Sequence, residues 1–173
     1  PLGLTEATVY LYYQNKAALL EAVFKLMEKK LITPSFRPPG PYWFRQRPDL
    51  DAAEFLVRGA ERFFQKADKE TQRIWRILII TQYSHPSARK GVEEQLLQAP
   101  VHFFTELFTN MQQAGIMKQN ADCFSLGRIT ASLFFQYSMH TNLLAAWDEE
   151  DTPAFQKLFS HLAEDIRLIV YIY

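Results

Sequence analysis

Apolar side chains recur along this chain at intervals of three and four residues, and the alternation typical of β-strands is almost absent. Such spacing places apolar residues on one face of an α-helix. The predicted fold class is therefore all-α, a helical bundle. A short helix is expected to begin after Thr5. Longer helices are expected over residues 16–31, 51–67, 70–83, 87–114, 122–147 and 152–173.

Several helix starts carry residues suited to capping. Asn15, either Asp49 or Asp51, and Asp122 can each accept a hydrogen bond from a backbone N–H in the first helical turn. Thr152 followed by proline is a further start signal. The apolar face of the helix over 51–67 is expected to comprise Ala52, Leu56, Gly59, Ala60, Phe63 and Ala67.

Prolines and glycines predict where helices are interrupted. Residues 34–48 contain five prolines and Gly40, so we expect a stiff loop without a helix there. Pro100 is expected to kink the helix that opens at Ser87. Gly115 is expected just beyond the end of that helix, in the left-handed conformation.

Composition limits the class of protein. Nineteen basic and nineteen acidic residues give a net charge of zero, so the chain as a whole lacks the basic excess of an autonomous DNA-binding domain. The single Cys123 excludes an internal disulfide and fits a reducing cytoplasm. We find neither a signal peptide nor an apolar run of membrane-spanning length, so we expect no membrane association. Fourteen Phe and eight Tyr favour an aromatic-lined pocket or interface.

The N-terminal segment has the features of two helices that are joined by a short link and bind an anion. Gly3 and Leu4 fit a tight turn before the Thr5 cap. Lys16 falls in the first turn of the second helix, where the helix dipole disfavours a cation unless an anion lies nearby. A nucleic-acid phosphate would supply that anion.

This segment resembles the TetR (tetracycline-repressor-like) family of regulators. The residues that match the family pattern in type and spacing are Gly3, Thr5, Thr8, Tyr10, Tyr12, Lys16, Leu19 and Leu20. Leu2 and Leu11 depart from it. The resemblance implies that residues 1–16 are a remnant of a helix-turn-helix DNA-binding domain, with its recognition helix, and that 17–173 form a ligand-binding and dimerisation domain. The first two helices of the family's reading head are expected to precede Pro1.

The resemblance also implies which residues contact DNA. Tyr10 and Lys16 match positions that hold phosphates, and Glu6 and Thr8 have side chains able to read base edges. The alternative is an ordinary capped helix pair with exposed polar residues. The candidate DNA-binding residues are Thr5, Glu6, Ala7, Thr8, Tyr10, Tyr12 and Lys16.

A pocket for a small hydrophobic effector, neutral or weakly anionic, is expected among the later helices. By resemblance these helices surround the effector cavity, whereas the alternative for each residue is plain core packing. The candidate ligand-binding residues are Trp75, Leu78, Tyr83, Phe103, Phe104, Leu107, Phe134, Tyr137 and His140.

No catalytic, metal-binding or cofactor-binding motif stands out. The four histidines lack the spacing of a helical metal site, and the acidic run 148–151 has the character of a solvated loop. We therefore expect neither an enzyme nor a cofactor.

The expected function is that of a ligand-responsive transcriptional regulator, a repressor released from a palindromic operator by its effector. A homodimer is expected through helices 122–147 and 152–173, which carry apolar residues on more than one face. Small residues such as Gly127 and Ala131 would permit close approach. The alternative is a helical small-molecule carrier or enzyme with an accidental helix-turn-helix resemblance.

Overall fold

A computed structural model of the chain describes residues 5–31, 37–65, 69–140 and 152–172. These residues fold into helices, with no strand in the described ranges, so the all-α prediction is confirmed. Residues 1–4 and 141–147, on which part of the sequence predictions fall, lie outside them. The elements are α1 Glu6–Tyr12, α2 Lys16–Leu31, α3 Pro41–Arg45, α4 Ala52–Gln65, α5 Lys69–Thr81, α6 Pro86–Gly91, the π-helix η1 Val92–Gln98, α7 Ala99–Gln113, α8 Cys123–Met139 and α9 Thr152–Ile172.

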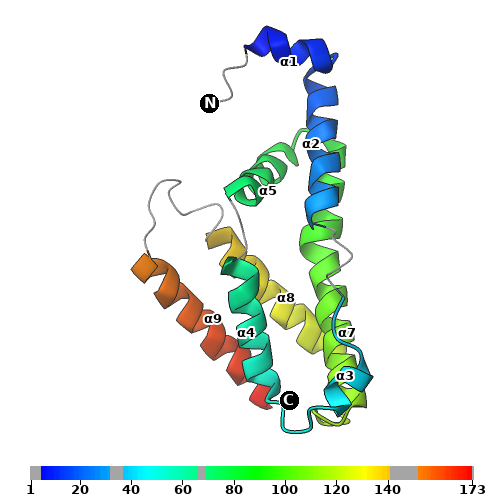
Figure 1. The fold of residues 1–173 in the computed structure, drawn as a ribbon, viewed down its shortest axis with the longest axis vertical. Coiled ribbons are helices and arrows are strands. Elements are labelled where there is room, and N and C mark those ends of the chain that lie inside the picture. Colours follow the sequence, from blue (N-terminus) through cyan, green and yellow to red (C-terminus); the bar gives the residue numbers. More distant parts are fainter. Residues whose placement is uncertain (1–4, 32–36, 66–68, 141–151, 173) are drawn as a thin grey trace.

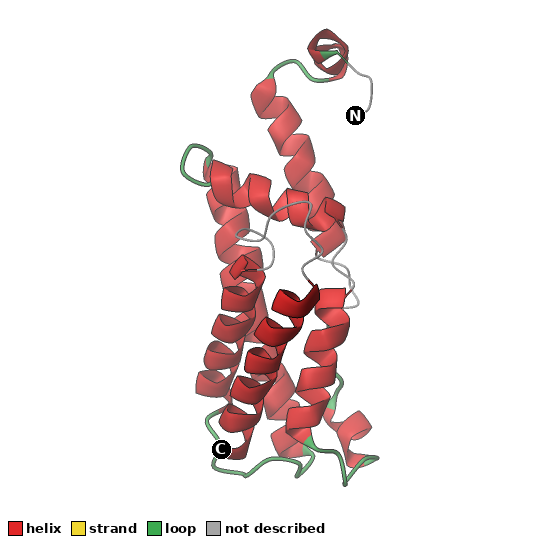
Figure 2. Cartoon of the chain, turned by 90° about the vertical axis from the view of Figure 1, so that its left-hand side faces the viewer, coloured by secondary structure: helices red, strands yellow, loops and turns green. Residues whose placement is uncertain are grey.

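The body of the molecule is a bundle of α4, α7, α8 and α9, and α2 rises from it as an arm with α1 at its far end (Figure 1). The side view gives the same division into a lower bundle and an upper arm (Figure 2). α2 packs against α5 and α6, and α4 and α8 both pack against α9. α1 is thus held away from the main core.

Four of the predicted caps are confirmed. Each capping side chain accepts a hydrogen bond from the backbone N–H three residues ahead, which satisfies one of the N–H groups left unpaired at a helix start. The donor–acceptor distances are 3.3 Å for Thr5, 2.8 Å for Asn15, 3.0 Å for Asp51 and 3.1 Å for Asp122.

The prediction that residues 34–48 contain no helix is wrong for their second half. α3 begins at Pro41, a position where the missing N–H has no partner to lose and the fixed φ already suits a helix. Phe44 on α3 is fully buried in the main core. The Asn110 side chain of α7 donates to the Pro39 carbonyl at 3.0 Å and fixes the approach to this short helix.

Of the two remaining predictions about helix interruptions, the one for Gly115 is confirmed, and the kink at Pro100 stays a prediction. Gly115 follows the end of α7 with φ +80°, as predicted for a left-handed residue after a helix. Near Pro100 the α-helical winding is interrupted by η1, the π-helical segment directly before α7.

The predicted apolar face of α4 is partly wrong. Gly59 and Phe63 are exposed, and Ala67 lies outside the described residues. The predicted Ala52, Leu56 and Ala60 are buried, and the buried face is completed by Ala53, Val57 and Phe64 on the neighbouring stripe. The stripe is turned because α4 must face α9 as well as the aromatic residues of the bundle.

Two separate groups of buried residues hold the molecule together. The larger joins α3, α4, α7, α8 and α9. The smaller, which we call the upper cluster, consists of Leu78, Ala88, Val92 and Leu96, with Leu20 of α2 packed against it. The arm is therefore anchored by a cluster distinct from the main core.

Among the described helices, α7 and α8 pack against each other most extensively, and Gly127 lies at their contact. A Cβ at Gly127 would lie 2.7 Å from the backbone nitrogen of Thr105. Ala131, one turn later, is also buried. The small residues of α8 thus serve packing within the chain rather than a free face.

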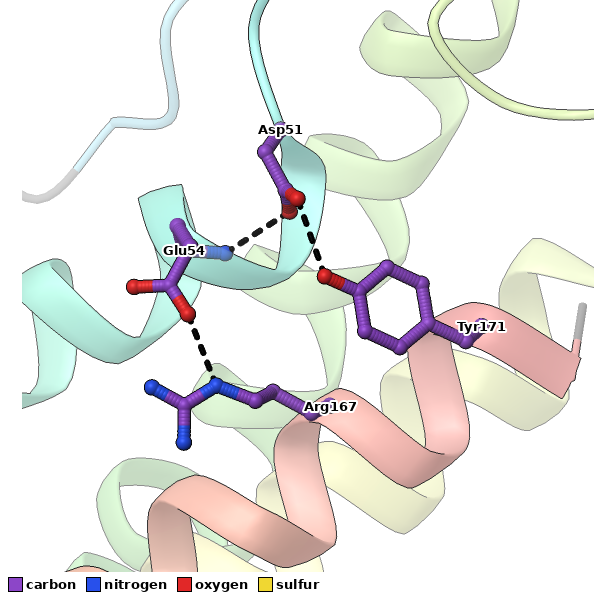
Figure 3. A network of polar contacts seen from close by, with 4 residues as sticks. All are labelled: Asp51, Glu54, Arg167 and Tyr171. Carbon is purple, nitrogen blue, oxygen red and sulfur yellow. Dashed lines mark hydrogen bonds and ion pairs between the residues drawn. The ribbon is translucent and has the colours of Figure 1, made fainter.

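A polar network joins the start of α4 to the end of α9 (Figure 3). Asp51 caps α4 with one carboxylate oxygen, while its other oxygen accepts from the Tyr171 hydroxyl at 2.9 Å. Arg167 donates to Glu54 at 2.7 Å. These bonds hold two helix ends that are far apart in sequence.

Candidate functional site

The first candidate site is the α1–α2 pair at the tip of the arm. The Thr5 and Thr8 hydroxyls lie 2.9 Å apart, and Tyr13 ends α1 by donating its N–H to the Val9 carbonyl at 3.1 Å. The Asn15 cap then opens α2. Two capped helices with a three-residue link therefore form a defined unit at the end of the molecule.

Several predicted DNA-contacting residues are accessible there. Tyr10 is 43% exposed and Tyr12 80% exposed. Lys16 is exposed, and the first turn of α2 contains no acidic residue that would neutralise it. Glu6 and Ala7 belong to α1, but their side chains lie outside the described part of the chain. Leu11, one of the departures from the family pattern, is 84% exposed.

The second candidate site is an aromatic cluster inside the bundle. Phe104 of α7 and Phe134 of α8 have ring centroids 4.8 Å apart. The ring of Phe64 from α4 lies 5.6 Å from Phe134 and 4.3 Å from Tyr137. Phe103 lies edge-on to Phe104 at 5.2 Å. Three helices thus bring their rings together at this level, in geometries favourable for aromatic pairs.

Tyr137 adds a polar group to this cluster. Its side chain is only 3% exposed, and this burial raises its pKa well above the ordinary value. The hydroxyl, which is protonated near neutral pH even at its ordinary pKa of 10, is thus held still further from ionisation. Buried among rings, it can donate a hydrogen bond to a polar atom of a bound molecule.

The structure brings together only part of the predicted ligand-binding set. Phe103, Phe104, Leu107, Phe134 and Tyr137 belong to or pack against the main core. In contrast, Trp75 and Leu78 belong to the upper cluster, where Phe135 of α8 also packs. α8 reaches both groups through its adjacent residues Phe134 and Phe135.

Two predicted pocket residues stand apart from both clusters. Tyr83 follows the end of α5 and is 83% exposed. His140 is exposed at the C-terminal end of α8. Neither side chain is placed with the buried rings.

Sequence reasoning missed two contributors to the aromatic cluster. Phe64 contacts both Phe134 and Tyr137, yet the spacing on α4 favoured its neighbour Phe63. Phe159 of α9 lies 6.0 Å from Tyr137. The pair Leu56 and Phe64, eight residues apart with Ala60 between them, was the signal that could have identified the true stripe.

The described residues contain no group of three or more potential metal-ligating His, Cys, Asp or Glu side chains. Within the same ranges, no helix combines the length and the apolar character needed to cross a membrane. A search of family models, of curated proteins and of solved structures finds no match to this chain.

Proposed function

We propose that this chain is a ligand-responsive, DNA-binding transcriptional regulator of the TetR type, acting in the cytoplasm. The observation that carries the proposal is the α1–α2 unit. Both of its caps form, and Tyr10, Tyr12 and Lys16 are exposed at the end of an arm. The boundary at residue 16 between a helix-turn-helix segment and a ligand-binding and dimerisation domain belongs to the same proposal.

An exposed lysine at a helix N-terminus supports phosphate contact. The ammonium and the unpaired N–H groups of the first turn both favour an anion at that place. The Tyr10 hydroxyl is a second neutral donor on the adjacent helix. Together they would fix α1 on the DNA backbone of an operator.

The aromatic cluster supports a small hydrophobic effector. Phe103 and Phe134 are half-buried at its edge, and Tyr137 contributes one neutral donor. A mostly apolar lining with few polar groups is typical of small-molecule sites. The effector would act through its different affinities for operator-bound and free arrangements of the arm.

A homodimer through α8 and α9 supports recognition of a palindromic operator. The faces of these helices that the chain leaves uncovered include large apolar side chains, which a second copy can bury. They are Phe124, Ile129, Leu168 and Ile172, exposed by 55%, 40%, 61% and 61%.

The DNA-binding part is tested by selecting operator sequences from random DNA duplexes with the purified protein. Enrichment of a palindrome, lost when Tyr10 and Lys16 are both replaced by alanine, is the expected result. If no sequence is enriched while the protein binds apolar ligands, the helical carrier is the better description.

The effector-binding part is tested with a thermal-shift screen of neutral and weakly anionic apolar compounds. A compound that binds the folded state raises Tm. Phe104→Ala should abolish that shift. Phe108→Ala is the matched control, because Phe108 is equally buried on α7 but makes none of the ring contacts of the aromatic cluster. Equal loss in both variants would mean general destabilisation rather than a lost site.

A further inference from the structure

The helix that runs from Pro86 to Gln113 is continuous, but its middle segment η1 is wound as a π-helix. The Ala99 N–H donates to the Glu94 carbonyl, five residues back. The Gln98 side chain likewise donates to Glu93, five residues earlier, at 3.1 Å. A backbone hydrogen bond and a side-chain hydrogen bond therefore both have the five-residue spacing of a π-helix.

Pro100 gives a physical reason for this winding. It has no N–H to donate to the Leu96 carbonyl, and its ring would crowd that carbonyl in a regular α-helix. The π-helical segment lies directly before it. π-Turns of this kind are rare and are concentrated at functional sites.

η1 supplies half of the upper cluster that anchors the arm. Val92 and Leu96 are buried there with Leu78 of α5 and Ala88 of α6, and Leu20 of α2 packs against them. The orientation of Val92 and Leu96 is set by how η1 is wound. The packing of α2 against α6 and the upper cluster therefore depends in part on that winding.

The two windings differ by a definite rotation. A π-turn contains one residue more than an α-turn. If η1 were wound as an α-helix, that additional residue would become part of the regular helix, and the register of α6 relative to α7 would shift by one residue. α6 would turn by about 100° and move by about 1.5 Å relative to α7. Ala88 and Val92 would leave the upper cluster, and α2 would lose its packing against α6 while it keeps its packing against α5.

We propose that η1 is a conformational switch: its π form anchors α2 on the upper cluster, and its α form releases α2. The switch does not require that α1 bind DNA. If the proposed function holds, it connects Phe103 and Phe104, at the start of α7, to the recognition helix. Pro100 and the packing of the upper cluster both favour the π form, so the α form is the minor state, and Pro100→Ala raises its share.

Two variants distinguish the winding of η1 from the rotation of α6 that a change of winding would cause. Deleting Gln95 removes the additional residue, so η1 becomes α-helical while α6 and α7 keep their faces. Pro100→Ala restores the missing N–H at unchanged length, so α winding rotates α6. Deleting His102, an exposed residue of α7, is the matched control, since it imposes the same rotation by removing a residue outside η1.

Amide hydrogen exchange of α2 is the measurement, with α4 and α9 as internal references for the folded bundle. Deletion of Gln95 should leave α2 exchange within about twofold of the parent. Pro100→Ala and deletion of His102 should each raise it by about tenfold or more. Unchanged α2 exchange in Pro100→Ala, or equal loss of α2 protection in both deletions, would overturn the switch.

If Pro100→Ala also unfolds α4 and α9, substitutions in the side-chain pair Glu93 and Gln98 on η1 test the switch instead. Glu93→Ala removes the partner that suits only the π winding, whereas Glu94→Ala removes the i, i+4 partner of Lys90. Faster α2 exchange in Glu93→Ala than in Glu94→Ala supports the switch, and equal exchange contradicts it.

Discussion

Gly127→Ala tests how closely α7 and α8 approach. The added Cβ would overlap the Thr105 hydroxyl and lie 2.7 Å from the Thr105 backbone nitrogen and 3.0 Å from its Cα. A side chain can rotate away, but the backbone of α7 cannot. To reach ordinary contact the two helices must separate by about 0.7 Å at this point, against the dense packing of the core.

The cost follows from two opposing effects. Overpacking of a buried site costs about 1–3 kcal/mol, and a clash with backbone belongs at the upper end of that range. Alanine in place of glycine stabilises a helix interior by about 1 kcal/mol. Gly127→Ala should therefore lower the free energy of unfolding by about 2 kcal/mol.

Gly59→Ala is the matched control, because Gly59 lies inside α4, is exposed, and has nothing within 4 Å of the added Cβ. It should raise the free energy of unfolding by about 1 kcal/mol. Urea unfolding followed by circular dichroism measures both. If Gly127→Ala proves as stable as Gly59→Ala, the close approach of α7 and α8 is wrong. Adding Thr105→Ala to Gly127→Ala should recover only part of the loss, since the backbone contact remains.

Three further predictions concern the other features. Lys16→Ala should weaken DNA binding for all sequences alike and flatten the salt dependence by about one unit of slope, whereas Lys25→Ala on the same helix should not; a titration of affinity against salt checks this. Hydrogen bonding to the backbone at the start of α4 lowers the pKa of Asp51 below its ordinary value of 3.8. The stabilisation of the folded state by the Asp51 carboxylate is therefore fully present above pH 3.8, and it is lost as the pH falls through the lower pKa that Asp51 has in the folded state. Asp51→Ala should cost about 1 kcal/mol at neutral pH and weaken the acid dependence of the urea midpoint; an unaltered dependence would contradict this assignment. Light scattering should give a dimer mass at micromolar concentration, and replacing Leu168 and Ile172 by glutamate should give a monomer; a parent monomer would refute the dimer.

Local signals in the sequence were enough to predict most of the described helices and four of their caps. A cap is decided within four residues, so Thr5, Asn15 and Asp122 could be identified without knowledge of the fold. The short α3 was missed because prolines were counted as breakers, although Pro41 at the first helical position is no obstacle. Position relative to the helix start decides the effect of a proline.

The grouping of side chains could not be predicted in the same way. Trp75 and Phe104 are both aromatic residues on apolar helix faces, yet they belong to different clusters because α5 packs on α2 and α6 rather than on the bundle. The stripe of α4 likewise depends on where α9 lies, which placed Phe64 inside and Phe63 at the surface. Tertiary contacts, not periodicity, choose between adjacent stripes.

The network at the end of α9 has a consequence for sequence variation among homologues. One carboxylate at residue 51 serves both as the cap of α4 and as the acceptor of the Tyr171 hydroxyl. Serine at 51 would keep the cap but has no second oxygen for the tyrosine, so it is compatible with phenylalanine at 171. Asparagine at 51 retains a carbonyl oxygen for the cap, and its amide N–H can donate a hydrogen bond to the hydroxyl oxygen of a tyrosine at 171. Positions 51 and 171 are therefore expected to covary, and positions 54 and 167 to change together in charge.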